Sequence, residues 1–129
     1  MFETEEQKER IILVAVATAD GDDTEQSLDE LEELGQTAGA VTVAKVIQNR
    51  EKVHAGTYVG KGKIEEIKNL AISLDADAVV CDDELSPAQY HNLQDALEIK
   101  VMDRTMVILD IFAAHAGSYE GKLQVELAQ

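Results

Sequence analysis

Two glycines and two lysines alternate at one point in the sequence, as Gly60, Lys61, Gly62 and Lys63, and Arg50 lies ten residues earlier. A glycine-rich turn that leads into a helix lets backbone N–H groups approach a phosphate closely, and neighbouring lysines add positive charge. These residue types therefore predict an anion site. The alternative is that the glycines serve only a tight turn.

This stretch does not match either common nucleotide-binding fingerprint. The phosphate loop of NTPases requires G-x-x-x-x-G-K-[ST]. Counted from Gly56, the Gly62-Lys63 pair is one residue too far, and Ile64 stands where the hydroxyl residue should be. The dinucleotide pattern G-x-G-x-x-G fails at Glu65. The residues alone show no complete enzyme site.

A second candidate site is the acidic corner that follows an apolar run, at Asp82 and Asp83. Carboxylates at the carboxyl edge of a parallel strand could hold Mg²⁺. Together with the glycine-lysine stretch they would make a small Mg²⁺-dependent nucleotide-binding or hydrolysing domain, and capping is the alternative explanation. We interpret Cys81 as an inert core residue and none of the histidines as catalytic: His54, His91 and His115.

Charge is distributed unevenly along the chain. The 129 residues carry a net charge of −15, which argues against a nucleic-acid partner, but residues 45–68 hold six basic and three acidic residues. The N-terminus is charged where a signal peptide needs an apolar run, and no apolar stretch reaches membrane length. The sequence therefore predicts a cytoplasmic protein with one basic segment.

Alternating strand and helix patterns must position these residues. Apolar runs predict strands, and helices are expected from capping boxes at Ser27-x-x-Glu30 and Ser86-x-x-Gln89, from Gly62 or Lys63, and from Thr105. This alternation predicts the α/β class, with a four-stranded parallel sheet in the order 2-1-3-4, helices on both faces and the start of a C-terminal helix. The predicted strands span residues 11–17, 40–48, 77–82 and 100–103.

Four fragments occur in an order that resembles the HflX family of ribosome-associated GTPases. They are YVGKGKIEEI, DDELSPAQYHNLQDAL, VMDRTMVILDIFAAHA and EGKLQVELAQ. The resemblance covers about residues 11–129. It implies an α/β N-terminal domain over residues 1–116 and, over residues 117–129, the start of a truncated helical hairpin. In the family this hairpin leads to a GTP-binding domain.

The resemblance implies a function for the fragment as well as its fold. Family members bind the large (50S) ribosomal subunit and separate stalled or stressed ribosomes, with GTP and Mg²⁺ in the GTP-binding domain. Some N-terminal regions are also credited with binding adenine nucleotides. The implied fragment is thus an rRNA-facing, non-enzymatic module that needs no cofactor of its own. Its implied partners are the large subunit and its own GTP-binding domain.

The resemblance also carries over to individual residues. The family's DRT motif falls on Asp103, Arg104 and Thr105, and Gly121 and Lys122 fill the turn before the hairpin. Leu123 and Leu127, one turn apart in the last segment, predict either disorder past about Gly121 or a homodimer through the C-terminal helix. The candidate phosphate-binding residues are Gly60, Lys61, Gly62, Lys63, Arg50, Arg104 and Lys122.

Overall fold

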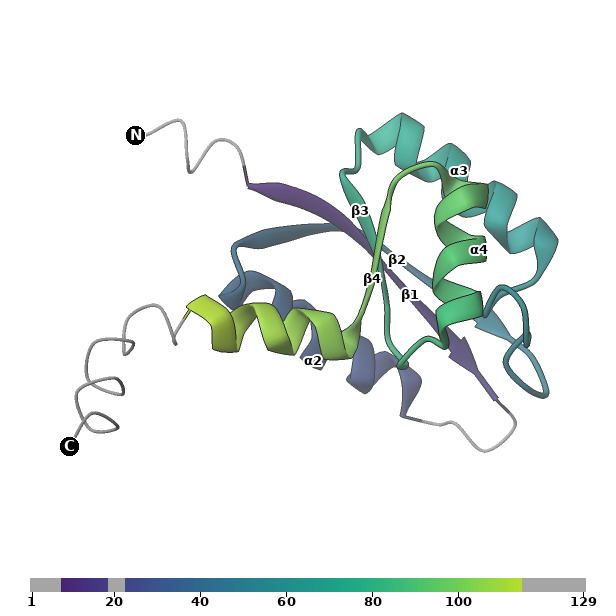
Figure 1. The fold of residues 1–129 in the computed structure, drawn as a ribbon, viewed down its shortest axis with the longest axis horizontal. Helices are drawn as coiled ribbons and strands as arrows, with labels where there is room; N and C mark the ends of the chain where they lie inside the picture. Colours follow the sequence, from purple (N-terminus) through teal and green to yellow (C-terminus); the bar gives the residue numbers. More distant parts are fainter. Residues whose placement is uncertain (1–7, 19–22, 115–129) are drawn as a thin grey trace.

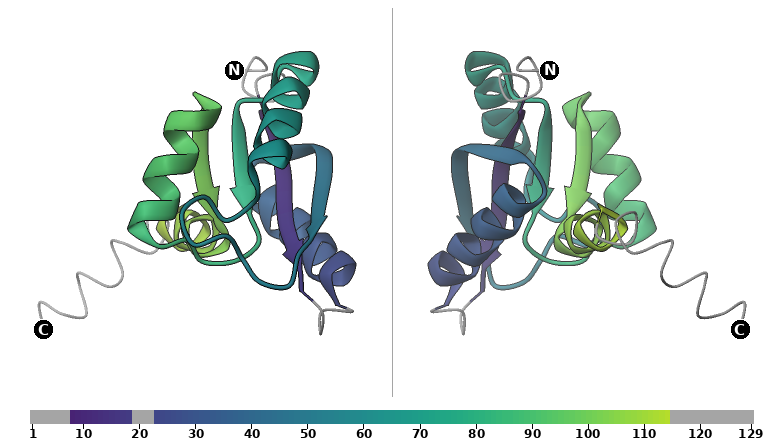
Figure 2. Two further views of the ribbon diagram at one scale, coloured as in Figure 1. Left: turned by 90° about the vertical axis from the view of Figure 1, so that its right-hand side faces the viewer. Right: turned by 90° about the vertical axis from the view of Figure 1, so that its left-hand side faces the viewer.

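Four parallel strands form a single sheet in the computed structural model, which describes residues 8–18 and 23–114. The strands lie side by side and run in one direction (Figure 2). Their order is β2-β1-β3-β4, so the predicted order 2-1-3-4 is confirmed. The strand bounds are Glu9–Ala17 (β1), Ala40–Asn49 (β2), Ala78–Cys81 (β3) and Lys100–Asp103 (β4).

Helices cover both faces of this sheet, as the sequence predicts (Figure 1). Helices α3 and α4 pack on one face, and α2 and a further helix over residues 104–114 pack on the other. The first strand supplies both cores in alternation, with Ile12 and Val14 toward α3 and Leu13 and Ala15 toward α2. The named helices span Thr24–Thr37 (α2), Lys61–Leu74 (α3) and Pro87–Leu97 (α4).

The predicted capping box before α4 is confirmed. Gln89 N–H donates to the Ser86 hydroxyl at 3.1 Å, and Ser86 N–H donates to the Gln89 side-chain oxygen at 3.0 Å. Pro87 occupies the first helical position, where its missing N–H has no consequence. This short-range motif could be predicted because all its partners lie within four residues.

The predicted capping box at Ser27 and Glu30 is wrong. Helix α2 begins earlier, at Thr24, and its N-cap residue Asp23 makes no side-chain capping bond. Ser27 therefore lies inside the first turn, and its hydroxyl donates to a carboxylate oxygen of Asp82 at 2.6 Å. The Ser27 hydroxyl, which the local pattern assigned to capping, therefore bonds to the residue that follows β3 instead.

Several predictions concern the last segment of the chain. The hairpin start at residues 117–129, Lys122 within it and the dimer through the C-terminal helix all lie outside the residues that the structure describes. Within the part that it describes, no helix combines the length and the apolar character needed to cross a membrane.

Candidate functional site

The glycine-lysine stretch forms the N-terminus of α3. Gly60 is the N-cap residue with an extended backbone (φ −73°, ψ 166°), and its N–H donates to the Gln48 side-chain oxygen at 2.8 Å. Within residues 8–18 and 23–114 no side chain caps this helix, and its first turn contains no acidic residue. Neither the N-cap residue nor the first turn of α3 therefore supplies a negative side chain to the first-turn N–H groups and the positive end of the helix dipole.

The two glycines differ in what the fold requires of them. A Cβ atom added at Gly60 would lie 2.8 Å from Arg50 Nη1 and 3.3 Å from Gln48 Nε2, so the ends of these two side chains would have to shift to accommodate it. A Cβ atom added at Gly62 would meet nothing within 4 Å. The structure thus explains Gly60 by close packing under Arg50 and gives no packing reason for Gly62.

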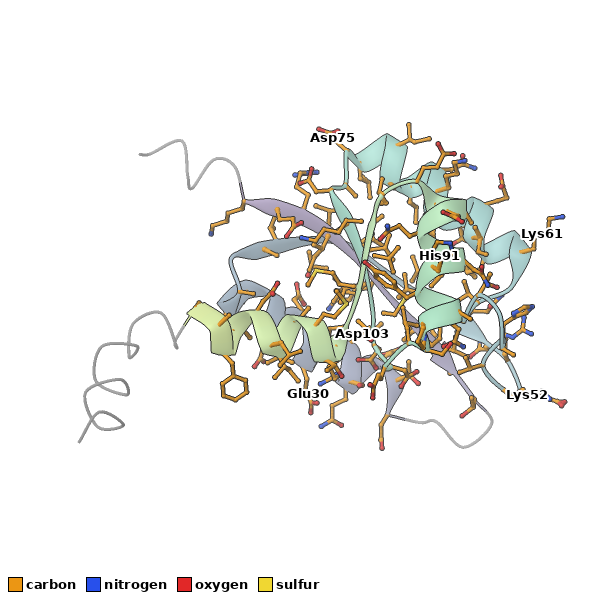
Figure 3. All side chains as sticks on the ribbon, in the orientation of Figure 1. Glu30, Lys52, Lys61, Asp75, His91 and Asp103 are labelled. Carbon is orange, nitrogen blue, oxygen red and sulfur yellow. The ribbon has the colours of Figure 1, made fainter. Side chains whose placement is uncertain are left out.

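Cationic side chains surround this helix end. Lys61 is exposed, and Lys63 Nζ pairs with Glu66 Oε1 at 3.0 Å one turn along the helix. Arg50 lies over Gly60, and its Nε donates to the Lys52 carbonyl at 3.1 Å. Lys52 and Lys61 lie on the same side of the molecule (Figure 3). The predicted candidates Arg50, Gly60, Lys61, Gly62 and Lys63 are therefore brought together.

Tyr58 fixes the loop just before the glycines, although the sequence analysis assigned it no role. Its side chain is 1% exposed, and its hydroxyl donates to an Asp83 carboxylate oxygen at 2.8 Å. Burial, followed by the bond to Asp83, raises the Tyr58 pKa above its usual range. Its backbone has φ +69°, a left-handed conformation that is unusual for a bulky residue. The buried side chain and the left-handed backbone of Tyr58 together fix the direction in which the chain enters α3.

His54 ties the rest of the loop to α4. Its Nδ1 accepts backbone N–H bonds from Gly56 at 3.1 Å and Thr57 at 3.2 Å. The His54 carbonyl accepts from Gln89 Nε2 at 2.8 Å, and the Gly56 carbonyl accepts from Asn92 Nδ2 at 2.9 Å. The loop is therefore held by hydrogen bonds to α4, and His54 acts in its architecture.

Arg104, a predicted phosphate contact, bonds within the domain. Its Nη2 pairs with Asp82 Oδ1 at 2.7 Å and donates to the Ser27 carbonyl at 2.8 Å. Both carboxylate oxygens of Asp82 are engaged, since the Ser27 hydroxyl donates to the other one. Arg104 as an RNA contact stays a prediction, and its observed bonds join α2, β3 and the last helix.

The two candidate metal ligands do not converge on a common point. Asp82 bonds to Arg104 and Ser27, whereas Asp83 accepts from Tyr58. Across the described ranges 8–18 and 23–114, no group of three or more His, Cys, Asp or Glu side chains is placed to hold a metal ion. Cys81 beside them is buried, and that burial raises its thiol pKa above its usual range.

Asp103, the first residue of the DRT motif, caps the last helix. It ends β4 and is 6% exposed. Its carboxylate oxygens accept from the Met106 N–H and the Leu85 N–H, both at 2.9 Å. The motif therefore has a structural role here, because Asp103 fixes the start of the helix and Arg104 connects that helix to Asp82.

The fold and loop together define a parallel α/β domain that has a cationic helix N-terminus but lacks the NTPase phosphate-loop pattern. Residues 25–113 match the family model described as "GTP-binding GTPase N-terminal". The chain belongs to this family, that of the N-terminal domains of GTPase HflX.

Similar proteins carry the name GTPase HflX in several bacteria. The chain is 67% identical to that of Lacrimispora saccharolytica, 48% to that of Caldanaerobacter subterraneus and 41% to that of Escherichia coli, over 129 residues in each case. Each match covers 100% of this chain and 30% of the relative. The chain thus spans about a third of these proteins, and their catalytic domain lies outside the matched part.

Solved structures share the fold. The complex of SsGBP with GDP matches with a TM-score of 0.62 and 24% identity, covering 93% of this chain and 33% of that one. A GTP-binding protein from Sulfolobus solfataricus in complex with GDP matches with a TM-score of 0.57 and 24% identity, covering 91% and 35%. At this identity the likeness supports the architecture alone.

Proposed function

We propose that this domain is the ribosome-binding module of an HflX-type GTPase, which docks on large-subunit rRNA when ribosomes are dissociated or rescued under stress. The observation that carries the proposal is the uncapped N-terminus of α3, with Lys61 and Lys63 in its first turn. Backbone N–H groups and lysines bind phosphates without reading sequence, which suits docking on a folded RNA surface. This function places the domain in the cytoplasm.

Charge segregation supports contact with phosphate at this end of the domain. The chain carries a net charge of −15, yet residues 45–68 have twice as many basic residues as acidic ones. Arg50 and Lys61 lie beside Gly60 and Gly62 at the surface of this segment. This surface offers hydrogen-bond donors and positive charge to a phosphate, and the acidic rest of the domain would face solvent or other protein.

We also propose that the GTP-binding domain of the same protein is a partner, and that GTP and Mg²⁺ are bound there. On the last helix Val107 packs into the core at 4% exposed, whereas Leu109 and Phe112 are 59% and 65% exposed. Two large apolar side chains three residues apart form one face of this helix. The chain covers 30% of the Lacrimispora relative, and in our proposal the remaining part of such a protein covers that face.

The test of rRNA docking removes both lysines of the first turn. Purified large ribosomal subunits are titrated with the intact GTPase that carries this domain, at several salt concentrations, with and without Lys61→Ala and Lys63→Ala. Loss of two phosphate contacts should lower the logarithmic salt slope by about two, or somewhat less for single-stranded RNA. Folding should change by no more than about 1 kcal/mol, since Lys61 is exposed and Lys63 loses one partly exposed ion pair with Glu66.

A matched control removes two other lysines. Lys45 pairs with Asp29 and Glu32, and Lys100 pairs with Glu9. Their double alanine variant changes net charge equally and should leave the salt slope unaltered. Equal affinity and slope for the Lys61 and Lys63 variant would reduce the loop to a structural turn. Nucleotide-selective, Mg²⁺-dependent binding to this domain alone would instead favour the nucleotide-binding alternative.

A further inference from the structure

A groove of about 400 Å³ lies between the C-terminal ends of α3 and α4. Its floor is apolar and includes Ala71, Leu97 and Ile99. The glycine-lysine loop lies at the other end of α3, as the positions of Lys61 and Asp75 show (Figure 3). Since α3 has 14 residues, about 20 Å separates its two ends. The groove is therefore a surface separate from the proposed phosphate site.

An exposed isoleucine borders this groove. Ile72 is 73% exposed, although it is a large apolar side chain, and it lines the groove beside Ala71. One exposed apolar residue needs no explanation by itself. Next to an apolar floor, however, it enlarges the apolar surface that a partner could cover. Ile72 does not belong to the buried face of α3, which is formed by Ile64, Ile67 and Ala71.

The rim of the groove is formed by two acidic residues in an unusual backbone conformation. Asp75 ends α3 with φ +55°, and Glu98 ends α4 with φ +60°. Glycine is the usual residue for this left-handed position, because a Cβ atom is disfavoured there. Glu98 also pairs with Lys68 at 2.9 Å, with 71% and 33% of the two side chains exposed. Carboxylates thus occupy both positions where glycine would be favourable.

The helix ends add to this negative charge. Neither α3 nor α4 has a basic residue in its last turn, so each carbonyl end keeps its partial negative charge. The carbonyl end of α3 already has one cationic partner, because Arg10 from β1 donates to the Leu74 carbonyl from Nε at 3.1 Å and from Nη2 at 2.8 Å. Lys68 offsets one of the two rim carboxylates. Lys68 itself lines the groove together with Asp75 and Glu98, so the lining keeps one net negative charge.

We propose that this groove docks a protein segment that places an apolar side chain between α3 and α4 and a lysine or arginine against Asp75 and Glu98. Charge complementarity selects this occupant. A second copy of a chain with net charge −15 is disfavoured, and so is an RNA phosphate at two negative helix ends. Residues 115–129 contain two acidic residues and one basic residue, so they do not supply the cationic segment.

The test uses short blocked peptides and the 129-residue chain labelled for NMR. Acetyl-Arg-Leu-Arg-amide should shift the Ile72 and Ile99 methyl resonances saturably. Acetyl-Glu-Leu-Glu-amide should not shift them, and acetyl-Arg-Ala-Arg-amide should shift them less, because it lacks the larger apolar side chain. Equal shifts from the acidic and basic peptides, or shifts spread over the acidic surface without saturation, would overturn the proposal.

A variant without the rim charges completes the test. Asp75→Gly combined with Glu98→Gly removes both carboxylates and suits the left-handed backbone, so folding should be retained or improved. Affinity for the Arg-Leu-Arg peptide should fall about two- to fivefold, as expected for one exposed ion pair with Asp75, because Glu98 already pairs with Lys68. Unchanged affinity would refute the cationic occupant. Concentration-dependent shifts of Ile72 without peptide would assign the groove to a second copy and also overturn the proposal. None of these outcomes depends on the rRNA contact at the other end of α3.

Discussion

Replacing Gly62 by alanine separates a structural role for the glycine-lysine stretch from a phosphate-binding role. Gly62 lies in the first turn of α3 with no left-handed backbone, and an added Cβ would meet no atom within 4 Å. Alanine in a helix is more favourable than glycine by roughly 0.5–1 kcal/mol, mainly because the unfolded chain loses freedom. We therefore expect Gly62→Ala to stabilise the domain by about 0.5 kcal/mol. This is the lower end of that range, because the backbone of a first-turn residue is only partly constrained.

The same substitution should weaken binding to rRNA if the helix N-terminus contacts phosphate. The new methyl group would stand in the open space through which a phosphate reaches the backbone N–H groups. Gly60→Ala is the comparison, because its Cβ would lie 2.8 Å from Arg50 Nη1 and require that side chain to move. We expect Gly60→Ala to lose stability and affinity together, whereas Gly62→Ala gains stability and loses affinity.

Urea unfolding of the domain and salt-dependent titration of large ribosomal subunits measure the two effects. In thermal unfolding, a gain of about 0.5 kcal/mol corresponds to a rise in Tm of about 2 °C for a domain of this size. If Gly62→Ala destabilises the domain, the first turn of α3 is not helical as the structure has it. If it stabilises the domain and leaves rRNA affinity unchanged, backbone N–H groups at this position do not contact phosphate.

Two further predictions concern the side chains that hold the carboxyl edge of the sheet. Arg104→Ala should destabilise the domain by about 2 kcal/mol in urea unfolding, because it leaves the 9%-exposed Asp82 carboxylate without its cation; a loss below about 0.5 kcal/mol would leave Arg104 free for RNA. Tyr58→Phe should cost about 1 kcal/mol at neutral pH by removing the bond to Asp83. Since the pKa of Tyr58 is raised in the folded domain, the wild type should lose stability as pH rises above about 10, where the unfolded tyrosine ionises. The Tyr58→Phe variant should lose less over that range, and parallel pH profiles would contradict this.

Hydrophobic patterning was sufficient to predict the sheet because its central strands, β1 and β3, are buried on both sides. The run from Ile11 to Ala17 is continuous and apolar, and its residues alternate between two cores. Right-handed crossovers then leave few arrangements for four parallel strands, and 2-1-3-4 is the one observed. The capping box at Ser86 was predictable for a related reason, since its bonds join neighbouring residues.

The contacts that shape the candidate site were not predictable, because they join residues far apart in sequence. Ser27 matched a local capping pattern, yet its hydroxyl bonds to Asp82, 55 residues away. Tyr58 gave no signal either, since a left-handed tyrosine backbone follows from its burial and its bond to Asp83. Arg104 has the residue type of an RNA contact, and only the fold reveals its bonds to Asp82 and Ser27. The sequence thus located the loop, but it could not distinguish basic side chains at the surface from basic side chains that form ion pairs within the domain.

The charges at the two ends of α3 connect the proposed function with the groove. A helix favours acidic residues in its first turn and basic residues in its last, each by about 0.3–1 kcal/mol. Helix α3 has Lys61 and Lys63 in its first turn and Asp75 after its last, which is the reverse arrangement. Glu66 offsets part of this at Lys63. The reversed charges reduce the stability of the isolated helix, but they make one end attract anions and the other attract cations. At the second end Arg10 already donates to the Leu74 carbonyl, which offsets part of the negative charge there. Under the two proposals, rRNA phosphate at the first end and a basic protein segment at the second would each offset an unfavourable charge, so each ligand should stabilise the domain as it binds.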